Sequence, residues 1–261
     1  MGKYDGYLIC SDFDGTLARE KNISAENRAA IREFTESGGL FTIASGRSPE
    51  FLTEYAGDIG INAPLMAING GAIADPVSGK LLSRVMLDDG ALTALCTLVR
   101  LLPATDAVDI VYCENGFTSR RFHAGVDLTS TEILSYTGKE IYKILLMYKE
   151  PEQAFASRHA AEILFGSKYI FQRSWPYGIE MLPIDGGKGN AIGTIRALCG
   201  DKVKCVIGVG DYENDIPLVE AADIGYAVAN AIDAVKEAAD RVTVSDCGTA
   251  IAEIIHSLPI L

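Results

Sequence analysis

Short apolar runs alternate with longer segments of helical periodicity along much of the chain. Tyr7–Cys10 is the first run, and the stretch SAENRAAIREFTESGG that follows it has Ser24 as a candidate N-cap and two glycines as a helix stop. LFTIA and APLMAI are the next runs. After Gly186 the alternation resumes with KGNAIGTIRALCG, VKCVIGV, ENDIPLVEAA and DIGYAV. This alternation predicts an α/β fold with a Rossmann-like parallel sheet.

The middle of the chain has a different pattern. Between about Lys80 and Pro183 the expected order is strand, helix, strand, helix, strand, helix and strand, and CENGF has the Asn-Gly pair of a hairpin turn. We therefore predict an α+β domain at 81–183, inserted into a sheet domain made of 1–80 and 184–261.

Charge and composition exclude several classes of partner. The net charge of −12 disfavours nucleic acid and leaves room only for a local basic pocket that binds a small anion. Nowhere do 18 apolar residues run together, so no membrane span is expected, and the N-terminus lacks the apolar stretch of a signal peptide. The six scattered cysteines predict free thiols in a reducing compartment, and hence a cytoplasmic protein. The oligomeric state stays open.

Four apolar runs end in side chains that can bind phosphate or a metal. If the four strands are parallel, these groups lie along one carboxyl edge of the sheet, where open α/β sheets bind ligands. In chain order the groups are Asp12 with Asp14, Ser45 with Arg47, Asn69, and Asp211 with Asn214 and Asp215.

The aspartates raise a problem that a cation would solve. Asp12, Asp14 and Asp211 gathered at one edge would repel one another as bare anions. Mg²⁺ suits a site of a few carboxylate oxygens, waters and a substrate phosphate. Lys188, between two glycines at a helix start, adds a positive charge and free backbone N–H groups. A metal beside a phosphate site is typical of phosphoryl transfer.

The motifs together resemble a known family. D-x-D-G-T-L at Asp12–Leu17, the serine of TIASGR, the lysine of GGKG and the stretch GDYENDIP are similar to the four motifs of the haloacid dehalogenase (HAD) superfamily. NGG after the third run and the insert between Ser45 and Lys188 resemble its Cof-type branch, which has a type II, C2B-like cap. The resemblance implies a HAD-like catalytic core with an inserted cap.

The resemblance also implies roles for the site residues. Asp12 would be the nucleophile that becomes an aspartyl phosphate, and Asp14 the general acid and base. Ser45 and Lys188, with Asn214, would bind the phosphoryl oxygens. An aspartate at position 14 favours a phosphohydrolase over dehalogenase chemistry.

The metal site follows from the same resemblance. Mg²⁺ would be held by Asp12, the backbone carbonyl of Asp14, and Asp211, with Asp215 in support. Each of these residues has a structural explanation when taken alone, as a turn, a helix cap or a solvated side chain. The four motifs in order make the joint coincidence improbable.

Two further residues have two interpretations each. Arg47 either contacts substrate or pairs with a surface carboxylate, and the second is favoured. Asn69 either orients the substrate or phosphate loop, or satisfies a turn. The histidines share no metal-ligand spacing, and GVGDYE lacks the third glycine of a dinucleotide fingerprint.

The resulting hypothesis is a Mg²⁺-dependent phosphohydrolase of small phosphorylated metabolites, with sugar phosphates as the expected class. A phosphomutase, which returns the phosphoryl group to substrate, uses the same residues. A receiver-type phospho-switch and a silent metabolite-binding protein are the non-enzymatic alternatives. The large insert and Asp14 argue against the switch.

Overall fold

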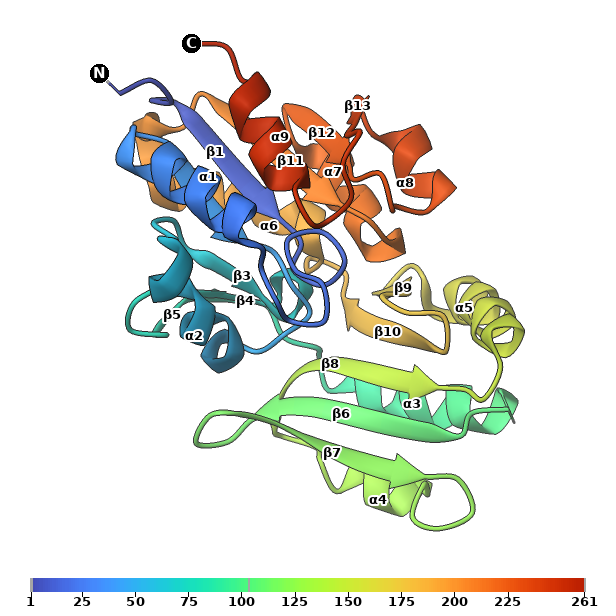
Figure 1. The fold of residues 1–261 in the computed structure, drawn as a ribbon. Helices are drawn as coiled ribbons and strands as arrows, with labels where there is room; N and C mark the ends of the chain where they lie inside the picture. Colours follow the sequence, from blue (N-terminus) through green and yellow to red (C-terminus); the bar gives the residue numbers. More distant parts are fainter. Residues whose placement is uncertain (1, 103, 261) are drawn as a thin grey trace. The chain divides into compact units, whose positions relative to one another are not determined.

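The computed structural model describes residues 2–102 and 104–260, which form two compact units (Figure 1). The first, here the split unit, contains Met1–Arg84 and Lys188–Leu261. The second, here the inserted unit, contains Val85–Gly187. The chain therefore leaves one unit, builds a second and returns to the first.

The split unit is built on a five-stranded parallel sheet in the order β13-β12-β11-β1-β2. β1 lies between β11 and β2, with Cys10 beside Gly208 on one side and Thr42 on the other. Because the strands are parallel, their carboxyl ends share one edge of the sheet. The predicted α/β class with a parallel sheet is confirmed. The strands are β1 (Tyr7–Ser11), β2 (Leu40–Ile43), β11 (Cys205–Gly210), β12 (Ile224–Ala227) and β13 (Arg241–Val242).

Helices flank this sheet, with α1 beside α9 and α6 beside α7 (Figure 1). Leu8 and Cys10, alternate residues of β1, pack with Ile195 of α6 and Leu218 of α7 in one apolar cluster. Ser24 caps α1 as predicted, since its side chain accepts a hydrogen bond from the Asn27 N–H. The helices are α1 (Ala25–Glu36), α2 (Pro49–Ile59), α6 (Lys188–Cys199), α7 (Ile216–Ala221), α8 (Asp233–Ala238) and α9 (Ala250–Ser257), with 3₁₀ turns η1 (Ile68–Gly70), η2 (Gly200–Lys202) and η3 (Glu213–Asp215).

The third apolar run departs from the prediction of four parallel strands. β3 (Leu65–Ala67) belongs to a separate antiparallel sheet with β4 (Ala72–Ala74) and β5 (Leu81–Arg84). A single parallel bridge, Ala44 to Met66, links it to the end of β2. The chain reverses after three residues because η1 takes up left-handed backbone angles, with φ of 50° at Ile68 and 52° at Asn69.

The inserted unit has a five-stranded sheet in the order β7-β6-β8-β10-β9 and its own apolar core. All of its pairings are antiparallel. The predicted hairpin at CENGF is confirmed: Asn115 and Gly116 both have positive φ and join β6 to β7. The elements are α3 (Gly90–Leu101), β6 (Ala107–Cys113), β7 (Phe117–His123), α4 (Ser130–Leu134), β8 (Glu140–Met147), α5 (Pro151–Phe165), β9 (Tyr169–Gln172) and β10 (Gly178–Pro183).

The structure also bears on cysteines and membranes. The six cysteines carry free thiols. Within the described part of the chain, none of the helices has the length and apolar character that crossing a bilayer requires.

Candidate active site

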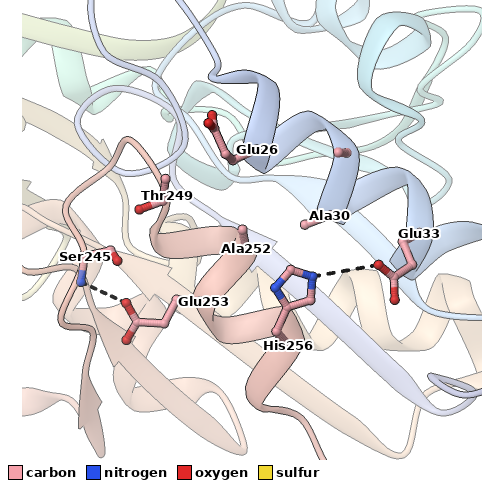
Figure 2. Close-up of a pocket in the computed structure, with 9 residues that line it drawn as sticks. Glu26, Ala30, Glu33, Ser245, Thr249, Ala252, Glu253 and His256 are labelled. Carbon is pink, nitrogen blue, oxygen red and sulfur yellow. Dashed lines mark hydrogen bonds and ion pairs between the residues drawn. The ribbon is translucent and has the colours of Figure 1, made fainter.

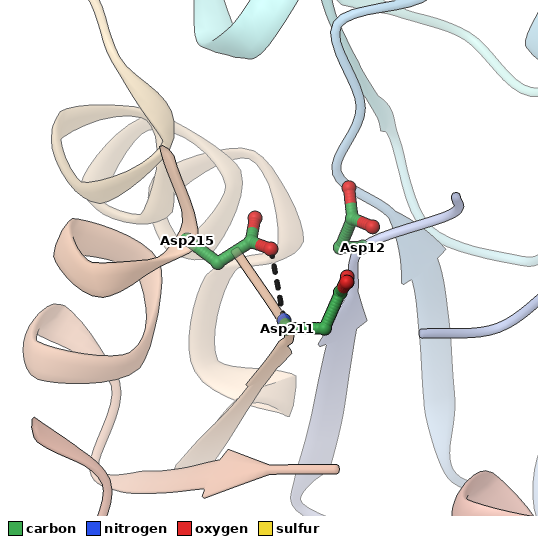
Figure 3. Close-up of side chains that lie close together, drawn as sticks. All are labelled: Asp12, Asp211 and Asp215. Atoms are coloured by element: carbon green, nitrogen blue, oxygen red, sulfur yellow. Dashed lines mark hydrogen bonds between the residues drawn. The ribbon is translucent and has the colours of Figure 1, made fainter. Parts of the chain in front are cut away.

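Three aspartates meet at the carboxyl edge of the parallel sheet. Asp12 directly follows β1, and Asp211 directly follows the neighbouring strand β11. Asp215 comes from η3, one turn further on. Figure 3 shows the three side chains converging, and one carboxylate oxygen of each lies within 4.8 Å of the other two.

The backbone holds Asp215 in place. Its Oδ2 atom accepts hydrogen bonds from the N–H groups of Asp211, at 3.0 Å, and Tyr212, at 3.1 Å. The first of these is the dashed line in Figure 3. Gly210 makes the close approach possible, because a Cβ at that position would lie 2.2 Å from the Cβ of Asp215. The glycine of the GDYENDIP motif therefore has a steric role.

Lys188 is the cation of this cluster. It is fully buried at the start of α6, and its Nζ lies 2.6 Å from Oδ1 of Asp12 and 2.6 Å from Oδ1 of Asp215. Gly189 lets the helix start approach the chain at Pro217, since a Cβ there would lie 2.7 Å from the Pro217 carbonyl oxygen. One ammonium thus bridges two of the three carboxylates.

The single positive charge of Lys188 does not balance the negative charges of three carboxylates, of which two are buried and one, Asp211, is half-buried. Burial, followed by repulsion from Asp215, raises the pKa of Asp12 well above its usual range, although Lys188 opposes the shift. Burial and Asp215 likewise raise the pKa of Asp211 to about 6. Burial lowers the pKa of Lys188, but attraction to Asp12 and Asp215 outweighs it, so the pKa rises overall. The excess negative charge and the hard oxygen donors fit a divalent cation such as Mg²⁺.

Asp14 lies beside this cluster in a more open position. Its carboxylate accepts hydrogen bonds from Nε and Nη2 of Arg47, both at 2.9 Å. The favoured interpretation of Arg47 as the partner of a carboxylate is confirmed, and the carboxylate is the predicted acid and base. A substrate contact by Arg47 stays a prediction.

Ser45, Asn69 and Asn214 are linked to one another. The Asn69 N–H donates to the carbonyl oxygen of Ser45 at 2.8 Å, and Ser45 is itself buried. The Nδ2 group of Asn214 lies 3.4 Å from Oδ1 of Asn69. Asn69 therefore joins the loops after β2 and β11, and its role toward substrate stays a prediction.

Thr16 and Gly15 of the D-x-D-G-T motif also contact this cluster, although the sequence alone predicts no role for either. The buried Thr16 hydroxyl donates to Oδ1 of Asp211 at 2.7 Å. Gly15 has a φ of 89°, and a Cβ there would lie 2.5 Å from Oδ2 of Asp211. Both residues belong to the D-x-D-G-T motif, so the motif marks their positions. It does not indicate that their neighbour is Asp211.

A surface groove of about 470 Å³ runs between α1 and α9 (Figure 2). None of the predicted site residues lines it. Three of its charged or titratable side chains have local partners: Glu253 accepts from the N–H groups of Val244 and Ser245, and His256 lies 3.8 Å from Glu33.

Comparison with known proteins agrees with this geometry. The profile of the haloacid dehalogenase-like hydrolases matches residues 9–255. The chain belongs to this family. The resemblance to Cof-type HAD proteins and the expectation of a hydrolase of this superfamily are confirmed.

Individual relatives cover almost the whole chain. A 5-amino-6-(5-phospho-D-ribitylamino)uracil phosphatase of Bacillus subtilis is 29% identical, over 96% of this chain and 97% of its own. A phosphoglycolate phosphatase of Methanopyrus kandleri is 25% identical, over 96% of each chain.

Solved structures share the fold. A haloacid dehalogenase-like hydrolase from Bacillus subtilis superposes with a TM-score of 0.78 at 21% identity, over 96% of this chain and 99% of its own. A sugar phosphatase of HAD subclass IIB superposes with a TM-score of 0.75 at 18% identity, over 95% of this chain and 97% of its own.

Proposed function

We propose that this chain is a Mg²⁺-dependent phosphatase of small phosphorylated metabolites, with sugar phosphates as the substrate class. The observation that carries the proposal is the cluster of the buried Asp12, Asp215 and Lys188 with the half-buried Asp211 at the carboxyl edge of the sheet. The cluster combines a nucleophile, carboxylates suited to a hard cation and an ammonium suited to a phosphoryl oxygen.

In the proposed reaction Asp12 attacks the phosphorus of the ester, and the bond to the leaving alcohol breaks as Asp14 donates a proton to that oxygen. Water then attacks the aspartyl phosphate on Asp12, and Asp14 takes a proton from the water. Lys188, Ser45 and Asn214 bind the phosphoryl oxygens. Asp12, the Asp14 carbonyl and Asp211, supported by Asp215, would hold Mg²⁺, which supplies neutralisation of the phosphoryl charge.

The two units have separate roles in this proposal. The catalytic core is proposed at 1–80 and 184–261. The split unit, Met1–Arg84 with Lys188–Leu261, supports this proposal because it contains all the proposed catalytic and metal-binding residues. The insert predicted at 81–183 would act as the cap that selects the leaving group. The proposed partner is a small phosphate ester, and the free thiols support a reducing, cytoplasmic location.

The relatives support the substrate class in general terms. Proteins similar to this chain are named as phosphatases of a phosphoribitylamino-uracil and of phosphoglycolate, and a structural neighbour is named as a sugar phosphatase. The substrates given in these names are all small phosphate esters. A panel that includes sugar, sugar-alcohol and short acid phosphates therefore covers the relevant chemistry.

The test is phosphate release from that panel and from p-nitrophenyl phosphate, with Mg²⁺ or with EDTA. We expect Mg²⁺-dependent release that falls by about three orders of magnitude or more in Asp12→Asn, because the nucleophile is lost. Asp58→Asn, which changes a surface partner of Arg28, is the matched control and should keep full activity. Unchanged activity in Asp12→Asn would refute the mechanism. An isomeric ester in place of free phosphate would indicate the mutase, and a long-lived phosphoprotein without turnover the phospho-switch.

A further inference from the structure

The Asp14 carboxylate is bound in a fixed orientation. Arg47 presents two parallel N–H groups to its two oxygens, Nε to Oδ2 and Nη2 to Oδ1, both at 2.9 Å. This two-bond arrangement constrains the plane of the carboxylate as well as its position. Both side chains are partly exposed, at 39% for Arg47 and 47% for Asp14. An exposed ion pair adds little to the free energy of unfolding, so stability alone does not explain the arrangement.

Arg47 is itself oriented by an aromatic side chain. Its guanidinium carbon lies 4.9 Å from the centre of the Phe51 ring, in the first turn of α2. The Phe51 ring meets Phe13 edge-on, with ring centres 5.6 Å apart. Phe13 is fully buried and stands between Asp12 and Asp14 in the chain. Phe51 of α2 therefore contacts both Arg47, which binds the Asp14 carboxylate, and Phe13, which precedes Asp14 in the chain.

The backbone of Arg47 is also tied to the phosphate loop. Its N–H donates to Oγ of Ser45 at 3.3 Å, and its carbonyl oxygen accepts from the Ile68 N–H at 2.9 Å. The guanidinium that orients Asp14 thus extends from the same short loop as Ser45.

We propose that Arg47 is a positioning residue that orients the Asp14 carboxylate for the hydrolytic half of the reaction. In that step water forms a bond to phosphorus while the bond from phosphorus to the Asp12 oxygen breaks, and its electron pair returns to Asp12. The proton from water goes to Asp14, and inorganic phosphate leaves. This inference rests on the proposed function. Arg47 acts on the rate of hydrolysis only by orienting Asp14.

An aryl phosphate separates the two halves of the reaction. p-Nitrophenolate leaves without needing a proton, so transfer to Asp12 is insensitive to the orientation of Asp14, whereas hydrolysis is not. In Arg47→Met we expect a burst of about one nitrophenolate per active site, followed by a steady state roughly 10–100-fold slower than in wild type. The KM should fall with kcat, so that kcat/KM stays nearly unchanged. Arg47→Lys, which keeps the charge but has no fork, should recover part of the rate.

Two further variants make the result decisive. Arg28→Met removes a surface arginine that pairs with Asp58 and should behave as wild type. Phe51→Leu removes the ring beneath Arg47 and should slow hydrolysis in the same way, by a smaller factor. Thermal unfolding of each variant reports whether the fold is intact.

The outcomes separate the inference from the proposed function. A fall in kcat/KM without a burst would assign Arg47 to substrate binding and overturn the inference, as would wild-type kinetics. If wild type turns over and Asp12→Asn does not, the proposed function stands whatever Arg47 does. If wild type releases no phosphate, both fall.

Discussion

At the scale of single residues, the site has more negative charge than its own side chains neutralise, because three aspartates share one lysine. Lys188 bridges Asp12 and Asp215 at 2.6 Å each, whereas Asp211 has a hydroxyl partner in Thr16. A neutral hydroxyl offsets less charge than an ammonium. The cost of burying Asp211 as an anion therefore appears in its pKa, which rises to about 6.

This shift makes the stability of the metal-free protein depend on pH. The pKa of Asp211 is higher in the folded chain, about 6, than the ordinary value of 3.8. Folding therefore favours the protonated form, and this contribution is full below pH about 4 and lost as pH rises through about 6. In EDTA we expect Asp211→Asn to be more stable than wild type by about 1–3 kcal/mol at pH 8 and by much less at pH 5. Thermal unfolding at the two pH values measures this.

Mg²⁺ provides the matching control. At pH 8 it should stabilise wild type more than Asp211→Asn, because the variant has lost one carboxylate of the cluster. A stability difference that stays constant between pH 5 and pH 8 would contradict the titration argument.

The residues of the site could be named from the sequence, but their partners could not. D-x-D-G-T, the lysine of GGKG and GDYENDIP identified Asp12, Lys188 and Asp215, which the structure brings together. The bond from Thr16 to Asp211 spans 195 positions, and the sequence has no signal for such a distant pairing. Likewise, the sequence does not indicate which of the surface carboxylates pairs with Arg47, because that depends on how the loops after β1 and β2 lie in space.

At the scale of elements, the backbone of α7 lies close to two glycines of the sheet. A Cβ at Gly208 in β11 would lie 2.6 Å from the Leu218 carbonyl oxygen, and one at Gly225 in β12 would lie 2.5 Å from that of Val219. The two carbonyl oxygens are backbone atoms, which cannot rotate away, and at Gly225 the Cγ1 atom of Val219 is also 2.5 Å from the Cβ position. This close packing sets the position of α7, which follows η3 and Asp215 directly.

Gly225→Ala should therefore lower the free energy of unfolding by about 1–3 kcal/mol, because the helix must shift to accept the methyl group. Gly193→Ala is the matched control: it lies within α6, and nothing lies within 4 Å of its would-be Cβ. The control should stabilise the protein by about 0.5–1 kcal/mol, since glycine is a poor helix former. Urea unfolding of both variants measures the contrast. Two changes of the same sign would refute the packing argument.

The elements themselves were predictable to different degrees. The runs at β1, β2, β11 and β12 stand out because strands buried on both faces are continuously apolar. β10 is hard to predict from the sequence because its buried run contains Glu180, whose charge is offset by Lys143 in β8 at 2.7 Å. The antiparallel turn at β3 depends on left-handed angles at Ile68, which no propensity scale assigns to isoleucine.

At the scale of the whole molecule, each unit has an apolar core of its own. One buried cluster lies within the inserted unit and includes Leu95 of α3. Another lies within the split unit and includes Ile195 of α6. A unit with its own core can lose structure by itself, so the two units are expected to open with different free energies.

Native-state hydrogen exchange tests this independence with two variants, each of which creates a cavity in the core of one unit. Leu95→Ala and Ile195→Ala each remove a fully buried side chain, at an expected cost of about 2–5 kcal/mol. We expect Leu95→Ala to reduce the protection of amides in β6 and β8 while leaving β1 and β11 unchanged, and Ile195→Ala to do the reverse. Loss of protection in both units from either variant would mean that they unfold as one cooperative body. Independent opening would let the inserted unit change its stability and sequence while the aspartates at the edge of the parallel sheet keep their geometry.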